Sequence, residues 1–268
     1  MAVALLIGSF VIMILLKVPI ALALVVSSLL TGIYLDIPLS ALTQRMVNGL
    51  TSFSLLAIPF FILAGEIMNE GGISRRLINL SNVIIGKIRG GLAMVNVLAS
   101  TFFGGISGSA VADTSSVGSV LIPMMKKKGY HADYSVSVTI SSASQGVLIP
   151  PSHNMIIYSM AAGGVSVGSL FLGGLVPGIL LGLALMVTTY MIAVKRNYPV
   201  SEPVKKEEIP KIIKESLLGL MTVVIIIGGT VSGFFTVTES AAIGTVYAFI
   251  ITFFVYRDIP LSRFIVIL

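Results

Sequence analysis

Long apolar runs recur along the whole sequence and constrain its fold more than any other feature. Only 10% of the residues are charged and 56% are hydrophobic, whereas soluble domains carry about 25% charged residues. A transmembrane helix needs about 20 consecutive, mostly apolar residues. Runs near that length fall at Ala2–Leu16, Val18–Leu35, Ser52–Met68, Ser135–Ala162 (interrupted), Ser169–Val194, Ser216–Phe235 and Ala241–Val255. The sequence therefore predicts an all-α polytopic membrane protein.

The composition narrows the chemistry that the chain can carry. It has no cysteine, which excludes disulfides and cysteine-ligated metal or iron–sulfur centres. His131 and His153 are the only imidazoles in the sequence, so a histidine metal site is not expected. The net charge of +6 comes from basic residues in short segments between the apolar runs. That distribution is a topology signal and not a nucleic-acid-binding face.

The small, polar and glycine-rich stretch Gly104–Pro123 interrupts an otherwise apolar part of the sequence. Irregular backbone and a carboxylate such as Asp113 survive at membrane depth only where they line a cavity enclosed by protein. Basic residues flank the surrounding segment 91–125 at both ends, with Arg89 before it and Lys126–Lys128 after it. An element that enters and leaves on one side explains this pattern. We therefore predict that residues 91–125 form a re-entrant helical hairpin.

The basic residues also set the predicted orientation. If segment 91–125 is re-entrant and Lys17 lies in the cytoplasm, sixteen of the seventeen positive residues fall inside and Arg45 alone falls outside. This is the distribution that the positive-inside rule requires. The sequence therefore predicts a multi-pass protein whose N-terminus lies outside.

Two adjacent prolines, Pro150 and Pro151, interrupt the fourth apolar run. They remove two amide donors and disfavour helical geometry in the residue before them. A proline kink is one interpretation. We favour a broken helix over 131–162 whose unwound centre lines a cavity, because discontinuous helices of this kind characterise ion-coupled transporters. The polar residues that flank the break are Ser144, Gln145, Ser152 and Asn154.

One short segment occurs twice. Tyr34–Ser40 (YLDIPLS) returns as Tyr256–Ser262 (YRDIPLS), 222 positions later. The predicted orientation places the first copy outside and the second inside, which indicates an inverted-topology repeat. The second repeat would need a hairpin and a broken helix of its own. We therefore expect the sequence to be C-terminally incomplete, with its second repeat truncated.

Charges and apolar runs divide the chain into segments. We expect a loop at Asp36–Gly49, which contains Pro38 and Arg45. Segment 71–90 mixes basic residues with apolar ones, which favours an amphipathic helix in the membrane interface over a simple loop. The predicted segments are scaffold transmembrane helices (1–70), an interfacial arm helix (71–90), half of a transport domain (91–167, with hairpin 91–125 and broken helix 131–162), a transmembrane helix (168–195), a cytoplasmic linker (196–214) and the start of the second repeat (215–268).

Four stretches together resemble one family of membrane proteins. They are SFSLLAIPFFILAGEIMNEGGISRRL from residue 52, GGLAMVNVLASTFFGGISGSAVADTSSVGSVLIPMMKKKGY from residue 90, LIPPS from residue 148 and FFTVTESAAIGTVYA from residue 234. In these stretches the sequence is similar to the large membrane subunit (M, DctM-like) of TRAP, or tripartite ATP-independent periplasmic, transporters. It departs at His153 and Asn154, where many relatives carry an apolar residue and proline.

The resemblance implies an elevator-type secondary transporter coupled to Na+ in the cytoplasmic (inner) membrane of a bacterium or archaeon. It also implies two partners, a small four-helix membrane subunit (Q, DctQ-like) and a soluble periplasmic substrate-binding protein (P). The substrates expected from the family are organic acids such as C4-dicarboxylates, sialic acid and keto acids.

Oxygen-bearing and small residues at the hairpin tip are candidate Na+ ligands: Gly105, Ser107, Gly108, Ser109, Asp113, Thr114 and Ser115. The alternatives are small-residue helix packing for the serines and glycines, and capping of the second hairpin helix by Asp113. Candidate substrate contacts surround the break: Ser144, Gln145, Ser152, His153 and Asn154. Ser152 and Asn154 have an alternative role, which is to satisfy backbone groups freed by the prolines.

Two further function classes remain alternatives to a transporter. An intramembrane aspartyl enzyme needs paired carboxylates, and Asp113 has no partner in the neighbouring runs, so we do not expect an enzyme. An ion channel or a non-transporting assembly scaffold would need no broken helix with a polar lining. Glu239, which follows Thr236 at a predicted helix start, is expected to cap that helix.

Overall fold

The computed structural model describes residues 1–51, 53–201 and 204–267, and nearly all of its regular structure is helical. The all-α prediction is thus confirmed for the described part of the chain, where β-structure is limited to one isolated bridge between Arg89 and Val200. Ser52 at the start of the third predicted run, residues 202–203 of the predicted linker, and Leu268 lie outside the described residues. The chain divides into two compact units, Met1–Ser52 and Phe53–Leu268, whose boundary lies before the predicted limit at residue 70.

The first unit contains three helices, α1 (Ala2–Leu15), α2 (Ile20–Tyr34) and α3 (Leu39–Leu50). α1 and α2 pack against each other. The loop predicted at Asp36–Gly49 is wrong, because α3 occupies most of it. Pro38 immediately precedes the first helical residue and its carbonyl accepts the amide of Ala41, so the proline begins a helix here and does not prevent one.

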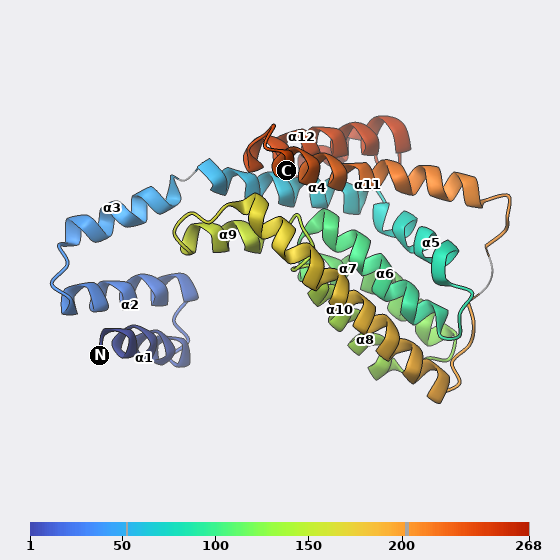
Figure 1. Cartoon of the computed structure of the whole chain (residues 1–268), viewed down its shortest axis with the longest axis horizontal. Helices are drawn as coiled ribbons and strands as arrows, with labels where there is room; N and C mark the ends of the chain where they lie inside the picture. Colours follow the sequence, from blue (N-terminus) through green and yellow to red (C-terminus); the bar gives the residue numbers. More distant parts are fainter. Residues whose placement is uncertain (52, 202–203, 268) are drawn as a thin grey trace. The chain divides into compact units, whose positions relative to one another are not determined.

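The second unit carries the hairpin and the break, which Figure 1 shows beside the long helix α10 (Val167–Lys195). Two antiparallel helices, α6 (Gly91–Ser107) and α7 (Ala110–Lys127), form the hairpin. The interrupted helix follows as α8 (Ala132–Gln145) and α9 (His153–Ala161). Both elements predicted from composition are therefore present, while their re-entrance into a membrane remains a prediction.

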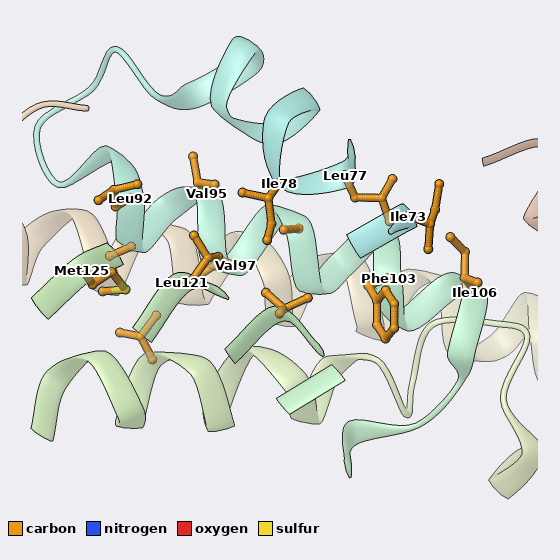
Figure 2. Packing of buried hydrophobic residues seen from close by; sticks show 14 of the residues in the cluster. Ile73, Leu77, Ile78, Leu92, Val95, Val97, Phe103, Ile106, Leu121 and Met125 are labelled. Carbon is orange, nitrogen blue, oxygen red and sulfur yellow. The ribbon is translucent and has the colours of Figure 1, made fainter. Parts of the chain in front are cut away.

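The core of the second unit fills the space between α5 (Ile73–Ile85), α6, α7 and α8. Figure 2 shows Ile73, Leu77 and Ile78 of α5 directed toward the apolar side chains of α6. α5 lies within the segment expected to form an amphipathic arm and buries one apolar face in this way. A helix that buries one face and exposes the other is typical of such an element.

The remaining helices include the longest apolar ones. α4 (Ala57–Glu70) follows a short 3-10 turn and packs against α12 (Val237–Ile250). α11 (Ile209–Ser232) packs against α12 and α5. Three helices of this unit are long and apolar enough to cross a membrane, namely α10, α11, and α12 with the π-helix that extends it to Tyr256.

Arg76 joins α5 to the later part of the same unit. Its guanidinium lies 2.6 Å from the carboxylate of Asp258 and 3.7 Å from that of Glu215, and it stacks 3.8 Å from the ring centroid of Tyr256. The arm helix is therefore held to the end of the π-helix by charge and by an aromatic face. Tyr256 belongs to the second copy of the recurring segment, whose inverted relation to the first copy remains a prediction.

Candidate functional site

The hairpin turn is short and sharply defined. α6 ends at Ser107, Gly108 adopts a left-handed conformation with φ +59°, and Ser109 is extended. The Ser109 hydroxyl accepts the amide of Ala112 at 3.3 Å, so Ser109 is the N-cap of α7. Irregular backbone is thus confined to Gly108 and Ser109, and the rest of the stretch Gly104–Pro123 is helical.

The hairpin tip touches the break in the following helix, backbone against backbone. A Cβ atom on Gly108 would lie 2.5 Å from the carbonyl oxygen of Pro151, and one on Gly104 would lie 2.3 Å from the Cα of Gly146. Real Cβ contacts are longer than this, so only glycine permits the approach. The two irregular segments predicted separately from the sequence therefore form a single site.

The break itself spans residues 146–152 between α8 and α9. Ser152 is extended and occupies the N-cap position of α9, yet its hydroxyl is fully buried and makes no hydrogen bond. The Nδ1 atom of the neighbouring His153 is also buried without a partner. The positive end of the α9 dipole and two unsatisfied polar groups thus lie beside the hairpin tip.

Gln145 anchors the end of α8 to α6. Its amide nitrogen donates to the carbonyl of Val97 at 2.8 Å and to the hydroxyl of Thr101 at 2.6 Å. The amide oxygen has no partner, although the side chain is fully buried. Gln145 therefore positions the break and has one acceptor left for a ligand.

Two of the predicted substrate contacts lie apart from this buried group. Ser144 is exposed, and its hydroxyl donates to the carbonyl of Ile140 in its own helix at 3.0 Å. Asn154 is exposed as well. The structure thus gathers Gln145, Ser152 and His153 behind the tip, while Ser144 and Asn154 face outward.

Asp113 lies in the first turn of α7 with no exposed surface. Neither carboxylate oxygen accepts a hydrogen bond of ordinary geometry, although the hydroxyl of Ser100 on α6 is close enough to act on the carboxylate. None of the ion pairs found among the described residues includes it. The proposed capping role for Asp113 is wrong, because an N-cap precedes the first helical turn and Ser109 holds that position.

Thr114 and Ser115 make local hydrogen bonds only. Each hydroxyl donates at 2.8 Å to the carbonyl four residues earlier, of Ala110 and Val111 respectively. Ser115 is exposed and lines a different cavity, of about 680 Å³, between α7, α5 and the end of α4. Two residues along a helix point about 200° apart, so the structure does not bring Ser115 to Asp113.

Sequence reasoning missed three buried polar residues in the same helices. Asn96 and Ser100 on α6 and Ser142 on α8 each leave an oxygen without a hydrogen bond, while the amide of Asn96 donates to Thr139 at 2.7 Å. Their spacing was a usable signal, since Asn96 and Ser100 are four residues apart and Ser142 follows Thr139 by three. Residues three or four apart share a helix face.

The available ligands are oxygen atoms. In the described part of the chain no group of three or more histidine, aspartate or glutamate side chains is placed to hold a metal ion. One carboxylate, hydroxyls and backbone carbonyls suit a hard cation of low charge and not a transition metal. Glu239 stands outside this site and forms the predicted capping interaction, its carboxylate accepting the Thr236 amide at 2.8 Å.

Comparison with known proteins places the whole chain in one group. A family model described as "Tripartite ATP-independent periplasmic transporter, DctM component" matches residues 7–268. The chain is 44% identical over 260 residues to a C4-dicarboxylate TRAP transporter large permease protein of Vibrio cholerae, which covers 96% of this chain and 57% of that protein.

Two further relatives carry other substrate names. A sialic acid TRAP transporter large permease protein of Vibrio cholerae is 43% identical over 84% of this chain and 52% of its own length. A 2,3-diketo-L-gulonate TRAP transporter large permease protein of Escherichia coli is 39% identical over 91% of this chain and 57% of its own length. The chain thus spans a little over half of the length of these relatives.

Proposed function

Because the chain belongs to the DctM component family of the tripartite ATP-independent periplasmic transporters, we propose that it serves in the large permease of a Na+-coupled importer of organic acids. The three relatives described above are named for C4-dicarboxylate, sialic acid and 2,3-diketo-L-gulonate. All three compounds carry a carboxylate, which is the substrate class proposed here. The family is one of transporter components and not of enzymes.

The observation that carries the proposal is the buried, unpaired carboxylate of Asp113 next to the hairpin–break contact. An ionised carboxylate buried without a partner is several kcal/mol less stable than a solvated one, so it takes up a proton or binds a cation. The candidate ligands around the tip are Gly105, Ser107, Gly108, Ser109, Asp113 and Thr114, while Ser115 faces away. Na+ is a hard cation whose preferred ligands are oxygen atoms, which this set supplies.

The proposed substrate contacts lie at the start of α9. Residues 91–125 and 131–194 contain no lysine or arginine, so this part of the chain has no guanidinium to bind a carboxylate. The N-terminus of a half-helix attracts an anionic group through its free amides and dipole. Ser152 and His153 provide buried polar atoms at that terminus.

The mechanism proposed is an elevator, in which hairpin and broken helix move together. Their backbone contact through Gly104, Gly108 and Gly146 supports treating them as one body. The partners proposed are a small membrane subunit and a periplasmic binding protein that delivers the substrate. The proposed location is the inner membrane, with the basic ends of α5 and α7 in the cytoplasm and the N-terminus outside.

Uptake by the full-length permease with its two partners tests this function. Proteoliposomes are given an inward gradient of Na+ or of choline, and uptake of labelled organic acid is measured at fixed pH. We expect uptake with Na+ only. Equal uptake with choline, driven instead by a pH gradient, would show that Asp113 carries a proton. Current through the permease without substrate transport would favour the channel alternative.

A further inference from the structure

A second cavity lies between the arm helix and the cytoplasmic end of the hairpin, away from the tip. It has a volume of about 240 Å³ and is open on one side. Apolar side chains of three helices form its floor, Ile78 of α5, Leu92 and Val95 of α6, and Met124 of α7. Figure 2 shows Ile78, Leu92 and Val95 on the facing sides of α5 and α6.

The rim of this cavity is basic. Lys127 and Lys128, at the end of α7, line it, and neither they nor any other lining residue meets an acidic side chain within the lining. Both lysines are exposed. The 680 Å³ cavity near Arg76 is different, because Glu70, Glu215 and Asp258 line it together with two arginines. The smaller cavity therefore attracts anions, and the larger one is close to balanced in charge.

Ser201 adds a hydrogen-bond donor to the rim. Its hydroxyl is buried, lines the cavity and has no partner among the residues that the structure describes. The preceding residue, Val200, pairs with Arg89, and this contact holds the segment against the loop between α5 and α6. α6 begins at Gly91 in the same region, so the positive end of its dipole also faces the rim.

We propose that this cavity binds an anionic phospholipid of the cytoplasmic leaflet. The phosphate would contact Lys127, Lys128 and the Ser201 hydroxyl, and the first part of an acyl chain would lie on the floor of Ile78, Leu92 and Val95. The proposal rests on the cytoplasmic placement of the α7 end described above. Basic pockets between helices on that side are a known way of binding lipid head groups.

The match of charge and polarity favours a lipid over other anions. A free phosphate would leave the apolar floor exposed to water, whereas a phospholipid covers both the floor and the basic rim. Met124 is 41% exposed next to the lysines, which places apolar surface where acyl chains begin. The bound lipid would touch α5 and α7 at once and so connect the arm helix to the hairpin.

Lipid retention by the purified full-length transporter tests the proposal. Native mass spectrometry after incubation with dioleoylphosphatidylglycerol or dioleoylphosphatidylcholine reports the fraction of protein that keeps a lipid. The test variant is Lys127→Gln with Lys128→Gln. The control is Lys126→Gln with Lys205→Gln, which removes two exposed lysines outside the cavity.

We expect phosphatidylglycerol to be retained in preference to phosphatidylcholine, and the test variant to bind it on the order of tenfold more weakly than the control. Equal losses in both variants would indicate general surface charge and overturn the proposal. Displacement by inorganic phosphate alone would show a phosphate site and not a lipid site. Circular dichroism of both variants checks that they fold. The readout is binding, so it is independent of whether transport uses Na+.

Discussion

Replacing Gly104 by alanine tests the contact that joins the hairpin to the break. The added Cβ atom would lie 2.3 Å from the Cα of Gly146, and the neighbouring backbone atoms of Gly146 are 3.3 and 3.4 Å away. Because these are backbone atoms, no side chain can rotate to make room. The two segments must separate, or one of them must shift.

The size of the effect follows from two opposing terms. Alanine in a helix interior is favoured over glycine by roughly 1 kcal/mol. Overpacking a well-filled contact costs typically about 1–3 kcal/mol, and the rigid backbone here places Gly104→Ala toward the upper end. The matched control is Gly173→Ala in the middle of α10, where a Cβ would meet nothing within 4 Å. The control gains the propensity term without the clash.

The assay is thermal unfolding of the purified full-length permease in one detergent, with uptake measured in parallel. Gly104→Ala should be less stable than Gly173→Ala by roughly 1–3 kcal/mol, and it should lose uptake because the ion and substrate groups no longer meet. If the two variants unfold at the same temperature and transport equally, the contact between Gly104 and Gly146 does not hold the site together.

Two further predictions concern side-chain contacts, each with a neighbouring residue as its control. Arg76→Met removes the guanidinium that lies 2.6 Å from Asp258 and should lower stability by about 1.5–3 kcal/mol, whereas Arg75→Met, on an exposed side chain, should change it little; equal unfolding temperatures would contradict the clamp. Gln145→Ala leaves the carbonyl of Val97 without its 2.8 Å donor and should lower stability by about 1–3 kcal/mol; the exposed Ser144→Ala should be near neutral in the same melt, and a similar loss in both would refute the anchoring role.

The hairpin and the break were predictable because their chemistry contrasts with an apolar chain. Two adjacent prolines, and a run of glycine and serine around Asp113, have few roles at membrane depth other than lining a cavity. That the two segments touch was not predictable. The contact depends on the packing of Gly104 against Gly146, residues 42 positions apart, and no local pattern reports it.

The errors came from residues whose role depends on tertiary placement. Asp113 was an equally good cap by residue type, and only the extended backbone of Ser109 decides which residue caps α7. Ser100 and Ser142 were overlooked because a serine in an apolar helix looks the same whether it faces lipid, core or cavity. α3 was missed because Pro38 was interpreted as part of a loop and not as the start of a helix.

The most direct test of the account is the Na+ concentration that gives half-maximal uptake, compared between wild type and Asp113→Asn. The full-length permease and its partners are used at matched expression, with the outward-facing Ser115→Ala as the control. Asparagine has nearly the shape of aspartate and lacks its charge. Losing one charged ligand among several oxygens should raise the half-saturating concentration about tenfold, equivalent to about 1.4 kcal/mol, while Ser115→Ala follows wild type. Superimposed curves for wild type and Asp113→Asn would contradict the claim that the buried carboxylate binds the coupling ion.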